Sequence, residues 1–70
     1  MVFRFYNDEW DKFIKNCGFT DDEMGIILFL RRGWAQADIA AELHISPRTL
    51  ARRKKIIENK IIRYISMHLD

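Results

Sequence analysis

The chain has 70 residues, of which 49% are hydrophobic, and a formal net charge of +2. This length allows one domain at most, and the hydrophobic content is too high for a disordered chain. The longest apolar run, residues 24–30, is too short to cross a membrane and the amino terminus lacks the pattern of a signal peptide, so we expect a cytoplasmic protein with no membrane partner.

No segment alternates apolar and polar residues for long, so the sequence predicts an all-α fold, a small domain of roughly four to five helices. The first helix should begin near Asn7, whose side chain can cap it, and should end at Gly18. Between these two residues the apolar side chains recur at the spacing of one helix face: Trp10, Phe13, Ile14 and Cys17. We expect Cys17 to be a buried, inert thiol.

The clearest local signal in the chain is a helix start at residues 19–24. Thr20 can cap the helix while Glu23 reaches back to it in a capping box. The helix that follows should run for roughly 13 residues and end at Gly33. It should lie in the centre of the fold because it is apolar nearly all round. Gly25 inside this helix costs about 1 kcal/mol relative to alanine, which a close crossing by another helix would explain.

The next two predicted helices are joined by a short break. The first covers about residues 36–43, the chain breaks at residues 44 and 45, and Ser46 followed by Pro47 starts a helix again. Serine caps a helix through its side chain, and proline suits the first helical position, where no amide donor is needed. The last helix could then run for about twenty residues or bend near Asn59, since no further glycine or proline interrupts it. Two short helices joined in this way describe a helix-turn-helix followed by a long C-terminal helix.

Charge is distributed unevenly along the chain. Residues 1–23 carry three cations and six acids, whereas residues 24–70 carry nine cations and four acids. Five of these cations lie together between Glu42 and Glu58: Arg48, Arg52, Arg53, Lys54 and Lys55. A basic patch on one element is expected of a protein that binds nucleic acid, although most charge runs are only solvated helix faces.

Residues 19–61 resemble the LuxR/GerE-type helix-turn-helix domain of bacterial transcription regulators. The residues that match occur at the intervals of that family without gaps: Phe19-Thr20, Glu23, Gly33, Ile39-Ala40, Leu43, Ile45-Ser46, Thr49-Leu50 and Ile57. The helix-turn-helix of the C-terminal region of sigma factors is similar in pattern. The resemblance implies a domain in which the second helix of the motif reads the major groove of DNA.

The chain departs from the family pattern in four places, one of which is Arg53 near the core side of the predicted recognition helix. Ala35 stands where the family usually has a serine or threonine cap, and His44 stands in a turn where many helix-turn-helix proteins have glycine. No glycine follows the predicted recognition helix. We therefore divide the single domain, residues 1–70, into an N-terminal helix (1–18), a helix-turn-helix core (20–59) and a C-terminal helical extension (60–70).

A helix that begins at Pro47 would turn one side of its surface to the core and the other to solvent. Leu50, Ile57 and Ile61 should face inward, and Arg48, Ala51, Arg52 and Lys55 outward. We expect Arg48 and Arg52 to contact base edges, and Lys54 and Lys55 to contact phosphates. The aliphatic stem of Arg53 should pack near the core. Side chains near the helix N-termini can also bind phosphate. The predicted DNA-binding residues are therefore Gln36, Ser46, Arg48, Thr49, Arg52, Arg53, Lys54 and Lys55.

The last helix carries more isoleucine than one small core can bury, which predicts a homodimer interface. The alternative is that this helix packs back on the first helix and buries Trp10 and Phe13. Aromatic residues outside these helices should be packing residues: Trp34, Phe3, Phe5 and Tyr6.

We expect neither a catalytic site nor a cofactor. The acids at residues 21–23 are explained by the helix start, and no serine, cysteine or histidine has a catalytic partner at helical spacing. Cys17, His44 and His68 are too far apart in the sequence to suggest a metal site.

These features predict sequence-specific binding of double-stranded DNA by a small bacterial or phage transcription regulator. The alternative is a protein-protein adaptor that uses the same fold to bind RNA polymerase or another regulator protein through its basic helix. DNA binding should weaken steeply as salt rises and should differ between sequences, whereas an adaptor should show no preference among duplexes.

Overall fold

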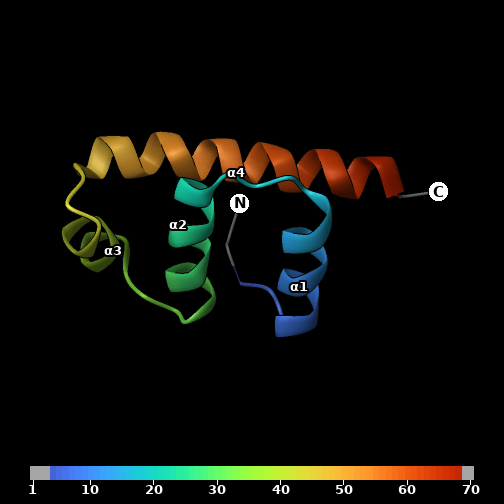
Figure 1. The fold of residues 1–70 in the computed structure, drawn as a ribbon, viewed down its shortest axis with the longest axis horizontal. Helices are drawn as coiled ribbons and strands as arrows, with labels where there is room; N and C mark the ends of the chain where they lie inside the picture. Colours follow the sequence, from blue (N-terminus) through green and yellow to red (C-terminus); the bar gives the residue numbers. More distant parts are fainter. Residues whose placement is uncertain (1–3, 69–70) are drawn as a thin grey trace.

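The computed structural model describes residues 4–68, which form four α-helices and no strand (Figure 1). The helices are α1 (Asn7–Asn16), α2 (Asp21–Arg31), α3 (Gln36–Glu42) and α4 (Pro47–His68). Helices α1 and α2 lie next to each other and both pack against one side of α4, whereas α3 packs near the end where α4 begins. The predicted all-α class is confirmed. Within residues 4–68, none of the helices combines the length and apolar character that crossing a membrane requires.

Helix α1 begins at Asn7, as predicted, but with a different N-cap residue. Tyr6 is the N-cap residue and Asn7 is already helical, so the prediction that the Asn7 side chain caps the helix is wrong. The free amide at this end is satisfied by Glu9, whose carboxylate accepts a hydrogen bond from the Tyr6 backbone N–H at 2.9 Å. At the other end Gly18 adopts a φ of 68°, the left-handed conformation that ends a helix.

Helix α2 begins with the predicted capping box. The backbone N–H of Glu23 donates to Thr20 Oγ1 at 3.3 Å, and the backbone N–H of Thr20 donates to Glu23 Oε1 at 2.9 Å. Ile26 and Ile27 are fully buried, so the helix is central as expected, but Leu28 on its other side is 46% exposed. The expectation that α2 is buried nearly all round is therefore wrong at Leu28, because neither α1 nor α4 covers that side.

The close helix crossing expected at Gly25 is absent: a Cβ atom added there would meet no other atom within 4 Å. Glycine in a helix interior weakens the helix because it exposes the backbone and loses more conformational freedom on folding than alanine. We therefore predict that Gly25→Ala raises the free energy of unfolding by about 1 kcal/mol, measured by urea denaturation. A destabilised variant would show that Gly25 has a packing role.

The break between α3 and α4 has the predicted chemistry. His44 takes a φ of 55°, so this non-glycine residue adopts the left-handed conformation that the turn requires. Ser46 then caps α4, because its hydroxyl oxygen accepts a hydrogen bond from the Thr49 backbone N–H at 3.1 Å. Ala35 is the N-cap of α3 and provides no side-chain hydrogen bond, as its lack of a hydroxyl predicts.

Helix α4 is continuous through Asn59 and has 22 residues, or about 33 Å at 1.5 Å per residue. Its apolar side faces the core as predicted, since Leu50, Ile57 and Ile61 are all 1% exposed or less. Farther along, Tyr64 contacts Phe13 of α1 edge to face, with ring centroids 5.9 Å apart. The C-terminal half of α4 therefore packs back on α1. This is the arrangement that the sequence analysis gave as the alternative to a homodimer interface.

The aromatic residues that the sequence places outside the helices only partly agree with their predicted role in packing. Phe5 packs edge to face against Trp10 and Phe13, with centroid distances of 5.1 and 4.9 Å. Trp34 stacks at a tilt on the Phe29 ring, 4.5 Å away, and keeps part of its surface exposed. Tyr6 is 79% exposed, so its prediction as a packing residue is wrong. Phe3 lies outside the described residues.

Candidate nucleic-acid interface

The side of α4 that faces away from the other helices is uncovered along its length (Figure 1). The residues predicted to face outward from its first turns, Arg48, Ala51, Arg52 and Lys55, are all exposed. Leu50 and Ile57 on the opposite side are buried, so the same turns that fix the helix to the core present the cations to solvent. This arrangement follows from the helical period, because residues three and four apart share a side.

Two of the predicted cations lie closer to the core. Arg53 and Lys54 are half-buried, at the flanks of the apolar side of α4. Burial lowers the pKa of the Lys54 ammonium, and the nearby Glu58 carboxylate opposes that change. The expectation that the Arg53 stem packs near the core agrees with this position. Lys54, in contrast, does not belong to the fully exposed side that carries Arg48 and Arg52.

Lys55 is exposed, and its ammonium lies 3.9 Å from the Glu58 carboxylate one turn away. A pair this long, with a solvated lysine, contributes little and can exchange for a phosphate oxygen. Lys55 is thus available to an anion on the outer side of α4.

The polar residues predicted near helix N-termini are surface residues. Ser46 is exposed and its hydroxyl, besides capping α4, donates to Thr49 Oγ1 at 3.0 Å. Thr49 is half-buried, and Gln36 is an exposed residue at the start of α3. The hydroxyls of Ser46 and Thr49 are therefore already engaged in the cap, whereas Gln36 offers an amide to solvent.

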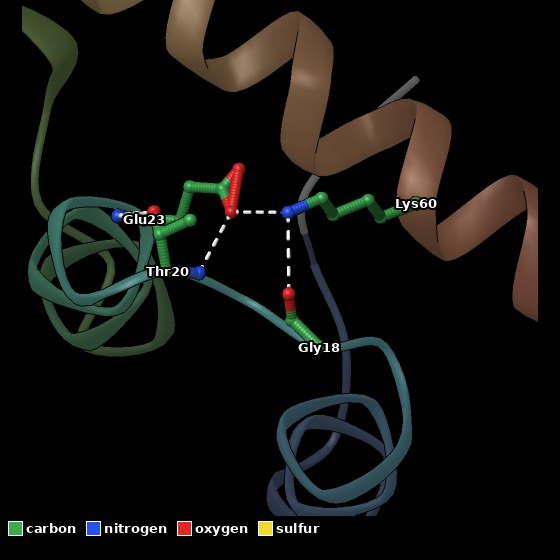
Figure 2. A network of polar contacts seen from close by, with 4 residues as sticks. All are labelled: Gly18, Thr20, Glu23 and Lys60. Carbon is green, nitrogen blue, oxygen red and sulfur yellow. Dashed lines mark hydrogen bonds and ion pairs between the residues drawn. The ribbon is translucent and has the colours of Figure 1, made fainter.

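A polar network joins helix α4 to the rest of the fold. Its contacts were not predicted from the sequence. Figure 2 shows the Lys60 ammonium between two acceptors, Glu23 Oε1 at 2.5 Å and the Gly18 carbonyl oxygen at 3.2 Å. Glu23 is 5% exposed, and its carboxylate also accepts the hydrogen bond from the Thr20 backbone N–H in the α2 capping box. The Glu23 carboxylate therefore caps the start of α2 and, through Lys60, joins α4 to the turn between α1 and α2.

The ionisation of Glu23 follows from these contacts. Burial alone would raise the pKa of the carboxyl, but the hydrogen bonds from Lys60 and from the Thr20 backbone, with the lysine charge, outweigh burial and lower the pKa. The carboxylate is therefore held in its charged form beside a charged lysine. The network fixes the rotation of α4 about its axis, and with it the direction in which the arginines point.

A second ion pair joins α1 to the end of α2. The Arg31 guanidinium lies 3.2 Å from Asp11 Oδ1 and also reaches the backbone carbonyl and side-chain oxygens of Asn7, each at 3.4 Å. Its partners are 20 and 24 residues away, so no local pattern could have identified them.

Cys17 is half-buried, and burial raises the pKa of its thiol while Lys60 acts in the opposite direction. A raised pKa disfavours the reactive thiolate and is consistent with an inert thiol. Among residues 4–68, no group of three or more histidine, cysteine or acidic side chains is placed to hold a metal ion.

Comparisons of the chain with family models, with curated proteins and with solved structures gave no match. The resemblance to the LuxR/GerE-type domain stays a prediction made from the spacing of residues in the sequence.

Proposed function

We propose that this protein binds double-stranded DNA with sequence specificity, as a small bacterial or phage transcription regulator, by placing the first turns of α4 in the major groove. The observation that carries the proposal is the uncovered side of α4, where Arg48, Arg52 and Lys55 are exposed while Leu50 and Ile57 of the same turns are buried. The helix is anchored on one side and cationic on the other.

The chemistry of the groove suits this surface. The major groove is roughly 12 Å wide and admits an α-helix, and a guanidinium can donate two hydrogen bonds to guanine O6 and N7. Lysine ammonium groups near the phosphates add affinity by releasing condensed counterions. The α3-turn-α4 arrangement, with Ser46 starting the second helix, supports a docking in which the first turn of α4 approaches base edges.

The test is selection of binding sequences from random duplex DNA, followed by titration of the selected duplex at several salt concentrations. The expected result is a shared sequence among the selected duplexes and a linear fall of log affinity with log salt. Failure to enrich any sequence, together with affinity that does not depend on salt, would contradict the proposal.

A protein-protein adaptor that binds RNA polymerase or a regulator protein is the second candidate. It is favoured by three large apolar residues that α4 leaves exposed, Ile56, Ile62 and Met67. An adaptor would bind all duplexes weakly and alike, so the same selection separates the two functions.

We also propose that the protein acts as a homodimer through the C-terminal half of α4. Ile62 is 45% exposed, and Ile65, half-buried, lies one turn farther on the same helix. Burying such residues in a partner stabilises a chain whose own core is small.

We predict that Ile62→Gln shifts the protein toward monomer, measured by sedimentation velocity without DNA. Glutamine keeps the helix and adds no charge, but it removes apolar area from the contact. The matched control is Leu28→Gln, because Leu28 is equally exposed, at 46%, but lies on α2. A wild-type protein that sediments as a monomer at all concentrations, or an Ile62→Gln variant as dimeric as the control, would contradict the dimer.

A further inference from the structure

We propose that the DNA-binding surface continues beyond the predicted recognition turns to Asn59 and Arg63, with Asn59 at a base edge and Arg63 on a phosphate. This inference rests on the proposed function, since it assigns further contacts to the same helix.

The first observation is that α4 does not bend or stop at Asn59. Its exposed residues recur at steps of three and four, and they return to the same side after each turn. We call this set the outer row: Arg48, Arg52, Lys55, Asn59, Arg63 and Ser66. From Arg48 to Ser66 the helix advances about 27 Å at 1.5 Å per residue, and every member of the row is exposed.

The second observation is the charge of this row. It contains four cations and no acid. The one acid of α4, Glu58, is 19% exposed, and its carboxylate lies 3.9 Å from the Lys55 ammonium. Among the described residues, the guanidinium groups of Arg52 and Arg63 take part in no hydrogen bond or ion pair. The positive potential of the helix therefore extends past its first turns, and Arg63 has a guanidinium available to an anion.

The third consideration is distance. Asn59 lies eleven residues, or about 16 Å, beyond Arg48 along the axis, whereas Arg63 lies about 22 Å beyond it. The groove is roughly 12 Å wide, and a helix that crosses it obliquely stays inside for longer than this width. With Arg48 and Arg52 at base edges, such a helix keeps Asn59 within the groove and brings Arg63 past its edge to the phosphate backbone. An asparagine amide in the groove can pair with adenine N6 and N7.

The experiment uses the full chain, the duplex it selects and an unrelated duplex of the same length. Arg63→Ala should weaken binding to both duplexes by the same factor, about three- to tenfold, and reduce the log-log salt slope by about 0.9, because one phosphate contact is lost. Arg63→Lys should restore the slope. Asn59→Ala should leave the slope unchanged and abolish the preference for adenine at one position of the selected site.

The matched control is Lys12→Ala, which removes one exposed cation from α1 and should change neither the slope nor the preference. An Arg63→Ala variant that behaves like the control, and an Asn59→Ala variant that selects the wild-type site, would overturn the extended surface. Loss of specific binding in Arg52→Ala alone would then leave the proposed function standing. If the wild-type chain binds no duplex, the proposed function itself fails.

Discussion

Replacing Arg52 with alanine should weaken specific DNA binding by about 1–3 kcal/mol and relax the preference for one base pair. Arg52 is exposed on the uncovered side of α4, one turn after Arg48, with the helix fixed beneath it by buried Leu50. Its loss removes a pair of hydrogen bonds to a base edge and one cation. Fluorescence anisotropy with the selected duplex and single-base variants of it would measure both effects.

The control for this prediction is Arg32→Ala, which removes an equally exposed guanidinium at the end of α2. Its binding and base preference should match those of the wild type. If Arg52→Ala retains full affinity and the same preferred sequence, Arg52 has no part in reading DNA.

Replacing Lys60 with methionine should lower the free energy of unfolding by about 3 kcal/mol, the lower end of the range for breaking a buried ion pair. Methionine keeps the aliphatic stem of the lysine but leaves the buried Glu23 carboxylate without its cation and the Gly18 carbonyl without its donor. We take the lower end because 30% of the Lys60 side chain is exposed. Urea denaturation measures the loss, which is large for a domain of this size.

Two further measurements separate this ion pair from a general effect of the substitution. Lys60→Met should destabilise a Glu23→Gln protein less than the wild type, because the unpaired charge is then gone. Since the pKa of Glu23 is lowered from its ordinary value of 4.5, its stabilising contribution is present above that value and is lost as the pH falls through the lowered pKa. Equal effects of Lys60→Met in both backgrounds would mean that the pair does not hold α4.

Local signals in the sequence correctly predicted how α2 and α4 begin. The capping box of Thr20 and Glu23 and the cap of Ser46 involve residues only three apart, so their hydrogen bonds depend on little else. The inward side of α4 was also predicted, because helical period alone places Leu50, Ile57 and Ile61 together.

Features that depend on how helices meet were missed. Lys60 pairs with Glu23 across 37 residues, and the capping box was by itself a sufficient explanation for that glutamate. The exposure of Leu28 and the open space at Gly25 follow from the sides of α2 that α1 and α4 leave uncovered, which no local pattern encodes. For the candidate site, the helical period correctly placed Arg52 on the exposed side of α4, whereas Lys54, which was also predicted to bind DNA, is half-buried.

If the uncovered side of α4 meets DNA, binding should change the NMR signals of that side. The measurement is a titration of the isotope-labelled protein with its selected duplex, followed by NMR of the backbone amides and arginine side chains. We expect the largest chemical-shift changes at Arg48, Arg52 and Lys55, and none at the exposed residues of α1. Shifts confined to α1 or α2, with the α4 arginines unaffected by saturating duplex, would contradict it.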